Sequence, residues 1–184
     1  MLEKLKESLR SCPIVRFDDY HYFIHPITDG IPRMPPEVME EILDSMEELV
    51  EDCDLLVGPE AMGICLVVPL SLRTRIPYNI VRKRRYSLEG EVSVSQVTGY
   101  SECDMYINGI LPGERVVLVD DVMSTGGTVR AVARALQSMG VEVVSIVVVV
   151  EKSDHREVLE RELGVPIKSL VKVRVHEGRV EVLS

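Results

Sequence analysis

The stretch VVLVDDVMSTGGT, residues 116–128, joins an apolar run to two adjacent carboxylates and then to a loop of hydroxyls and glycines. The apolar run predicts a buried strand over 115–119, and residues 125–139 repeat their apolar side chains at helical spacing. Asp120 and Asp121 then stand at the carboxyl end of the strand, where like charges repel each other and resist burial. The pattern indicates a site at which a ligand or a cation keeps both acids ionised.

The loop after the two acids has the composition of a phosphate-binding turn. Its residues are Ser124, Thr125, Gly126, Gly127 and Thr128. Glycines let backbone N–H groups approach a ligand, hydroxyls donate hydrogen bonds, and the start of a helix favours an anion. The preceding acids suit the hydroxyls of a sugar that carries the phosphate, and Mg²⁺ nearby would relieve their repulsion. The alternative is an acidic turn before a capped helix with no ligand.

Other phosphate-binding patterns fit less well. Neither GxxxxGK[ST] nor GxGxxG occurs in the chain. The residues therefore favour a phosphosugar over a nucleoside triphosphate or a dinucleotide.

Apolar runs separated by helical patterns predict the fold class. Strands are expected at 54–58, 78–81, 115–119 and 141–150. Helices are expected at 2–10, 36–53, 61–73, 125–139 and 154–163. Continuous apolar strands alternating with helices are typical of an α/β fold, with a parallel sheet covered by helices on both faces. Alternation over 171–183 predicts a C-terminal hairpin.

Two segments lack a regular pattern. Residues 11–35 contain four prolines and are expected to be irregular, forming a small N-terminal hood over the sheet. Residues 82–105 form a long connection, which in a compact domain is usually functional or mobile. We expect a single domain over 1–184. Its parts are the hood region (1–53), a core that carries the site (54–152) and a C-terminal helix and hairpin (153–184).

Composition narrows the class of protein. The 184 residues carry a net charge of −9, which argues against nucleic acid as a partner, because phosphate contacts need cations. The four cysteines form no CxxC pair, and we expect reduced thiols in a cytoplasmic protein. The start, MLEKLKESLR, does not match a signal peptide, and no apolar run approaches the ~20 residues that span a bilayer, so no membrane partner is expected.

VVLVDDVMSTGGT resembles the phosphoribosyl-pyrophosphate (PRPP) signature of type I phosphoribosyltransferases. The resemblance extends to GPEAMGI (58–64), PYNIVRKRR (77–85), EGEVSVSQVTGY (89–100) and HPITDGIP (25–32). It points to the adenine-type branch and, within it, to archaeal hypoxanthine/guanine enzymes. It implies transfer of 5-phosphoribose from PRPP to hypoxanthine or guanine with Mg²⁺, release of pyrophosphate, and a homodimer. Adenine as the base, giving AMP, is the alternative.

The resemblance also implies roles for particular residues. Asp120 and Asp121 would hold the ribose 2′- and 3′-hydroxyls near Mg²⁺, which is bound mainly through PRPP, and Ser124 to Thr128 would wrap the 5′-phosphate. The expected pyrophosphate contacts are Glu60, Ala61, Met62, Gly63, Arg82 and Lys83. Arg82 and Lys83, between an apolar strand and a long loop, suit a leaving group that gains negative charge, and a solvated basic patch over 82–85 is the alternative. Tyr100 matches a loop tyrosine of the adenine-type enzymes, or is an ordinary exposed aromatic.

The base contacts are less clearly marked. Three interpretations of Glu151 and Lys152 remain open. Lys152 donates to the O6 atom of a 6-oxopurine, or Glu151 instead accepts from an exocyclic amine of the base. In the third interpretation, both are exposed charges at a strand end. Ile24 and His25 lie in the hood region that contacts the base, although His25 before Pro26 also suits a packed turn. The chain departs from the family pattern at Met62, Gly99 and Ser124, which leaves no evident general base among the side chains. A water or a main-chain carbonyl is an alternative base, and Glu102 is a candidate for the glutamate that Gly99 replaces.

Two further hypotheses remain open from the sequence. A PRPP-sensing transcriptional regulator would use the same domain without catalysis, but such regulators usually add a DNA-binding helix-turn-helix, and residues 1–53 show no basic recognition surface. A pyrimidine or orotate enzyme matches the chain less well.

Overall fold

Strands β7 (Arg115–Met123) and β8 (Glu142–Glu151) form the centre of the fold in the computed structural model. The structure describes residues 2–17, 20–97, 102–152, 154–176 and 178–183. The two strands pair in parallel, and almost all their side chains are buried on both faces. This burial explains why both strands are continuous apolar runs in the sequence.

Four more strands complete the main sheet, whose order is β10-β9-β8-β7-β3-β4. β3 (Leu55–Pro59) and β4 (Tyr78–Val81) extend it in parallel on one side. On the other side β9 (Ile167–His176) pairs in parallel with β8, and β10 (Arg179–Val182) returns antiparallel. The C-terminal hairpin is confirmed, but its first arm begins earlier than the predicted residue 171 and belongs to the main sheet.

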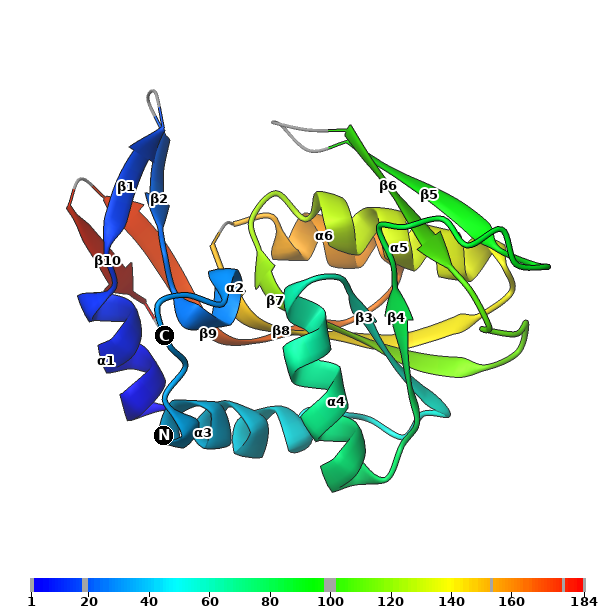
Figure 1. Ribbon diagram of the computed structural model, residues 1–184, viewed down its shortest axis with the longest axis horizontal. Helices are drawn as coiled ribbons and strands as arrows, with labels where there is room; N and C mark the ends of the chain where they lie inside the picture. The colour runs from blue at the N-terminus through cyan, green and yellow to red at the C-terminus, as the bar shows by residue number, and fades with distance from the viewer. Residues whose placement is uncertain (1, 18–19, 98–101, 153, 177, 184) are drawn as a thin grey trace.

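Helices cover both faces of this sheet, as predicted (Figure 1). α3 (Pro36–Glu47) and α4 (Met62–Thr74) pack on one face, with α5 (Gly127–Ser138) and α6 (Arg156–Leu163) on the other. Each face has its own apolar cluster, one with Ile42 and Leu66 and the other with Val132 and Leu159. α3 ends at Glu47 rather than near residue 53. No helix in the described part of the chain is long and apolar enough to cross a bilayer.

The prediction that residues 11–35 are irregular is wrong. After α1 (Glu3–Ser11), the chain forms a hairpin of β1 (Ile14–Phe17) and β2 (Tyr20–Phe23), followed by the short helix α2 (Pro26–Asp29). IVRF and YHYF are rich in residues that favour strands, but four-residue strands are too short to show a clear period. The prolines stand at the borders of these elements and do not break them.

Residues 82–105 also contain a hairpin where the sequence predicts a long irregular connection. β5 (Val92–Val97) pairs antiparallel with β6 (Glu102–Ile107), and β5 packs against α5. Val94, Met105 and Ile107 point into the core while their neighbours do not. Buried side chains thus alternate with less buried ones along both β5 and β6, and such alternation in two neighbouring segments is typical of a hairpin.

His25 fastens α2 to α1 inside the hood. Its side chain is fully buried, its Nδ1 accepts from the Ile27 N–H at 3.1 Å, and its Nε2 lies 2.8 Å from the Ser8 hydroxyl. Burial lowers the pKa of His25 to about 4. The unfolded chain therefore binds a proton near pH 6.5 that the folded chain does not bind, and stability falls as the pH drops below that value.

We expect the protein to lose about 2 kcal/mol of unfolding free energy between about pH 7 and pH 5 through this histidine. Urea denaturation of the wild type and of His25→Gln at both pH values measures the loss. The variant should show a flatter pH dependence, and His176→Gln, which alters an exposed histidine, should keep the wild-type slope. Equal slopes for all three proteins would contradict the assignment.

Candidate functional site

A cavity of about 320 Å³ opens at the carboxyl ends of β3 and β7. This is the edge at which parallel α/β sheets usually bind ligands. Its lining is Thr28, Pro59, Glu60, Ala61, Met62, Lys83, Met105, Asp120, Asp121, Val122 and Thr128. The structure therefore brings together residues from four segments that the sequence analysis selected separately.

Asp120 and Asp121 lie within β7, and not after it as predicted, because the strand continues to Met123 beside the long apolar strand β8. Their residues are only 5% and 8% exposed, and the Asp121 N–H donates to Asp120 Oδ1 at 3.0 Å. Burial raises the pKa of both carboxyls, and the neighbouring Asp120 charge raises that of Asp121 further. Two neighbouring buried carboxyls favour sharing a proton unless a cation or hydroxyl donors bind next to them.

The turn between β7 and α5 requires a glycine at 126. Gly126 has a φ of 75° and precedes the first helical residue, Gly127. A Cβ at Gly126 would lie 2.2 Å from a methyl group of Leu159, on the facing helix α6. The first turn of α5 contains no acidic residue of its own, and Thr128 in that turn lines the cavity, so this helix start suits an anion there.

The loop between β3 and α4 is held close to the sheet by two glycines. A Cβ at Gly58 would come within 2.7 Å of Val67 and 3.0 Å of the Gly63 carbonyl oxygen, and a Cβ at Gly63 within 2.9 Å of Pro59. Only glycines allow this approach. As a result, Glu60, Ala61 and Met62 line the cavity, whereas Gly63 packs against Gly58 and Pro59 and does not line it.

Two cations from the start of the 82–105 segment flank this loop. Arg82 Nε lies 2.7 Å from Glu60 Oε2, and the Lys83 N–H donates to the same oxygen at 3.2 Å. The Lys83 side chain lines the cavity, and its charge partly offsets the pKa rise that burial causes in Asp120. Glu60 therefore fixes both basic residues at the cavity mouth.

At the end of β8, Glu151 and Lys152 have different environments. Glu151 is 1% exposed, accepts from Ser169 Oγ at 2.8 Å and lies 3.2 Å from Lys172 Nζ. It is therefore not an exposed charge, and its role as a base contact stays a prediction. Lys152 is half-buried, and its Nζ lies 5.5 Å from the centroids of the Tyr22 and Phe23 rings.

The structure places the remaining candidates as follows. His25 is enclosed in the hood with both ring nitrogens engaged, so it acts as a packed turn residue and not as a base contact. Ile24 is half-buried and does not line the cavity. Tyr100 lies outside the described residues, as does the side chain of Glu102. Sequence reasoning missed Thr28 and Met105, although Thr28 stands in the quoted stretch HPITDGIP.

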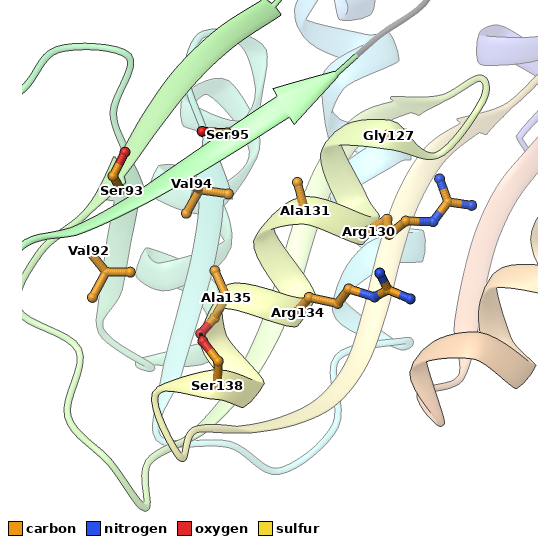
Figure 2. Close-up of a pocket in the computed structure, with 10 residues that line it drawn as sticks. All are labelled: Val92, Ser93, Val94, Ser95, Gly127, Arg130, Ala131, Arg134, Ala135 and Ser138. Carbon is orange, nitrogen blue, oxygen red and sulfur yellow. Dashed lines mark hydrogen bonds between the residues drawn. The ribbon is translucent and has the colours of Figure 1, made fainter.

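A second groove, of about 630 Å³, lies between β5 and α5 (Figure 2). Small side chains such as Ala131 and Ala135 face it, while Arg130 and Arg134 point away from β5. Both arginines pair with Glu162 of α6, at 3.0 and 2.5 Å. Since its charges are satisfied internally and only Gly127 belongs to the predicted set, the smaller cavity is the candidate site.

Comparison with known proteins agrees with this geometry. The model of the phosphoribosyl transferase domain family matches residues 35–179. A hypoxanthine/guanine phosphoribosyltransferase from Methanothermobacter thermautotrophicus is 50% identical over 186 residues, covering 99% of this chain and 95% of that protein. One from Methanobacterium lacus is 48% identical over 183 residues, covering 99% and 96%.

Among solved structures, the adenine phosphoribosyltransferase from Thermoanaerobacter pseudethanolicus superposes with a TM-score of 0.76 at 28% identity. The alignment covers 94% of this chain and 99% of that one. The similarity thus extends over nearly the whole of both chains.

We expect the buried acid pair to lower the unfolding free energy of the unliganded protein. The folded pKa of Asp121 lies above the unfolded one, so the cost is absent at low pH and grows as the pH rises above about 4. Asp121→Asn should therefore stabilise the unliganded protein at about pH 8 by roughly 1 kcal/mol or more, a Tm rise of about 2–4 °C per kcal/mol, with a smaller gain near pH 5. Differential scanning calorimetry measures both.

Asp44→Asn is the matched control, because it neutralises an exposed carboxylate on α3 that pairs with Arg73. It should give no stabilisation at either pH. A lower Tm for Asp121→Asn at about pH 8 would show that the pair is not a stability cost.

Proposed function

This chain belongs to the phosphoribosyltransferase family, and we propose that it transfers 5-phosphoribose from PRPP to hypoxanthine or guanine. The products are IMP or GMP and pyrophosphate, so the protein acts in purine salvage. The observation that carries the proposal is one cavity that joins the buried acid pair, the start of α5, the loop after β3 and Lys83. Together these four parts suit three portions of PRPP: the ribose hydroxyls, the 5′-phosphate and the pyrophosphate.

The acids and the turn suit the two ends of the ribose. Asp120 and Asp121 are acceptors once ionised, and the 2′- and 3′-hydroxyls supply the hydrogen-bond donors that buried carboxylates need. The 5′-phosphate fits the first turn of α5, where N–H groups and the helix dipole favour an anion. Holding the sugar at both ends fixes C1′ between the leaving group and the incoming base.

The loop after β3 and the two cations suit the pyrophosphate. In the transfer, the bond between C1′ and the pyrophosphate oxygen breaks, the bond between C1′ and a purine ring nitrogen forms, and the nitrogen loses its proton to water. Negative charge grows on pyrophosphate as this happens, and Arg82 and Lys83 stabilise that charge more strongly than the starting one.

We also propose Mg²⁺ as the cofactor, bound mainly through PRPP. The donor set fits, because Mg²⁺ prefers hard oxygens and is typically held by one or two carboxylates plus phosphates. Asp120 and Asp121 are such carboxylates, and a cation would offset the burial that raises both pKa values and the Asp120 charge that raises the pKa of Asp121 further. When bound, the ion neutralises charge on the pyrophosphate. Among the described residues, no group of three or more His, Cys, Asp or Glu side chains forms a metal cage.

The choice of a 6-oxopurine rests on the relatives and on Lys152. Relatives at 48% and 50% identity carry the name hypoxanthine/guanine phosphoribosyltransferase, whereas the adenine enzyme is 28% identical. The Lys152 ammonium is a donor at the end of β8, suited to a carbonyl at C6 and not to an amino group. We further propose a homodimer in the cytoplasm, as the family resemblance implies.

A panel of bases tests the proposed activity. Wild-type protein with PRPP and Mg²⁺ should form nucleotide from hypoxanthine and guanine, with kcat/KM at least about tenfold above that for adenine, as expected when a buried donor meets the wrong C6 group. Chromatography of the products measures this. Turnover of adenine alone would contradict the base assignment, and specific operator binding without turnover would support a regulator instead.

Lys83 provides a test of the pyrophosphate contact. Lys83→Gln should raise the KM for PRPP by about tenfold or more, the loss expected for a charge-assisted hydrogen bond, while the KM for the base changes little. Arg84→Gln is the control, since Arg84 is the neighbouring exposed cation, lies over the Tyr86 ring and does not line the cavity. If both variants bind PRPP like the wild type, the Lys83 side chain does not contact the pyrophosphate.

A further inference from the structure

Asp29, the last residue of α2, organises the hood by accepting three hydrogen bonds. Its Oδ1 accepts from the Tyr22 hydroxyl at 2.6 Å. Its Oδ2 accepts from the Thr28 hydroxyl at 2.6 Å and from the His25 N–H at 3.0 Å. Bonds this short between a hydroxyl and a carboxylate are charge-assisted, and they are stronger than bonds between neutral groups. The Asp29 carboxylate therefore fixes β2 and α2 relative to each other.

One of these three donors, Tyr22, also contacts Lys152 through its ring. The Tyr22 ring stacks beside the Phe23 ring, with centroids 6.2 Å apart, and Lys152 Nζ lies 5.5 Å from both centroids. Ring faces attract an ammonium within about 6 Å. The backbone of Lys152 is anchored separately, since its N–H donates to the Met123 carbonyl oxygen at 2.8 Å. The two rings therefore contribute to the position of the ammonium.

A second donor, Thr28, belongs to the cavity lining. Thr28, whose hydroxyl is bonded to Asp29, lines the cavity together with Asp120 and Asp121. Helix α2 contacts both β7 and α4, the two elements that carry the acid pair and the loop after β3. The Asp29 charge also adds a small contribution to the raised pKa of Asp121, after burial and the Asp120 charge. Asp29 is therefore bonded both to a residue of the cavity lining, Thr28, and to the ring that Lys152 approaches, Tyr22.

We propose that Asp29 is a positioning residue for base selection, which holds the Tyr22 ring and through it sets the Lys152 ammonium at the C6 side of the purine. This inference rests on the proposed function and adds a residue that lies outside the cavity lining. Asp29 touches neither PRPP nor the base. Its effect on the reaction is transmitted by Tyr22 to the side chain that distinguishes a carbonyl from an amino group.

Asp29→Asn separates this role from simple packing. Asparagine has nearly the same shape, but it offers one acceptor oxygen and an NH₂ group that must face a donor. Either Tyr22 or the pair of Thr28 and His25 then loses its acceptor. We expect the KM for hypoxanthine and guanine to rise about tenfold and the preference over adenine to fall by a similar factor, while the KM for PRPP changes by less than about twofold. Tyr22→Phe, which keeps the ring, should shift the same constants less.

A double-mutant cycle with Lys152→Gln tests the route of the effect. If Asp29 acts through Lys152, Asp29→Asn should lower the hypoxanthine-to-adenine ratio of kcat/KM about tenfold in the wild type and by less than about twofold in the Lys152→Gln background. Glu41→Gln is the matched control. Glu41 is also a carboxylate that accepts backbone N–H bonds near the hood, from Lys4 and Leu5, and it lies outside the contacts that hold Lys152.

Three results would overturn the proposal. One is an equal change of the ratio in both backgrounds, and another is a loss of kcat in Asp29→Asn with every KM unchanged, as expected if the variant merely reduces the folded fraction. The third is the same KM shift in Glu41→Gln. Absence of 6-oxopurine turnover in the wild type would instead refute the proposed function, so the two failures are distinguishable.

Discussion

Two adjacent carboxylates buried at the end of the central strand are the constraint around which this site is arranged. Asp120 and Asp121 are nearly inaccessible to water, so their ionised forms lack the solvation that exposed acids have. Three neighbouring parts of the structure reduce that cost or suit a ligand that would reduce it. Lys83 brings a positive charge to the cavity, the first turn of α5 brings N–H donors, and the loop after β3 closes the third side.

Glycines at close approaches make this convergence possible. Gly58 and Gly63 bring the start of α4 against β3, and Gly126 passes beneath Leu159 with a left-handed backbone. Side chains at these positions would push the helix starts away from the sheet edge. The hood completes the enclosure, because α2 lies over the ends of β7 and α4 and is held by Asp29 and His25.

The sequence predicts the central sheet well because burial on both faces leaves a strong signal. The long runs of β7 and β8 and the periodicity of α3 and α5 are visible without a structure. The hood and the β5–β6 hairpin are not, since short strands carry few residues per period and their pairing depends on partners elsewhere in the chain. The acid pair was found because it breaks an apolar run, whereas the enclosure of Glu151 by Lys172 and Ser169 depends on contacts across strands, which a linear pattern does not contain.

The most direct test of the central claim is a crystal structure of the protein with PRPP and Mg²⁺. The account predicts that the ribose hydroxyls lie within hydrogen-bonding distance of Asp120 and Asp121, with the 5′-phosphate on the backbone amides at the start of α5. PRPP bound in the groove between β5 and α5, or density that leaves both acids and the glycine turn without contacts, would contradict it.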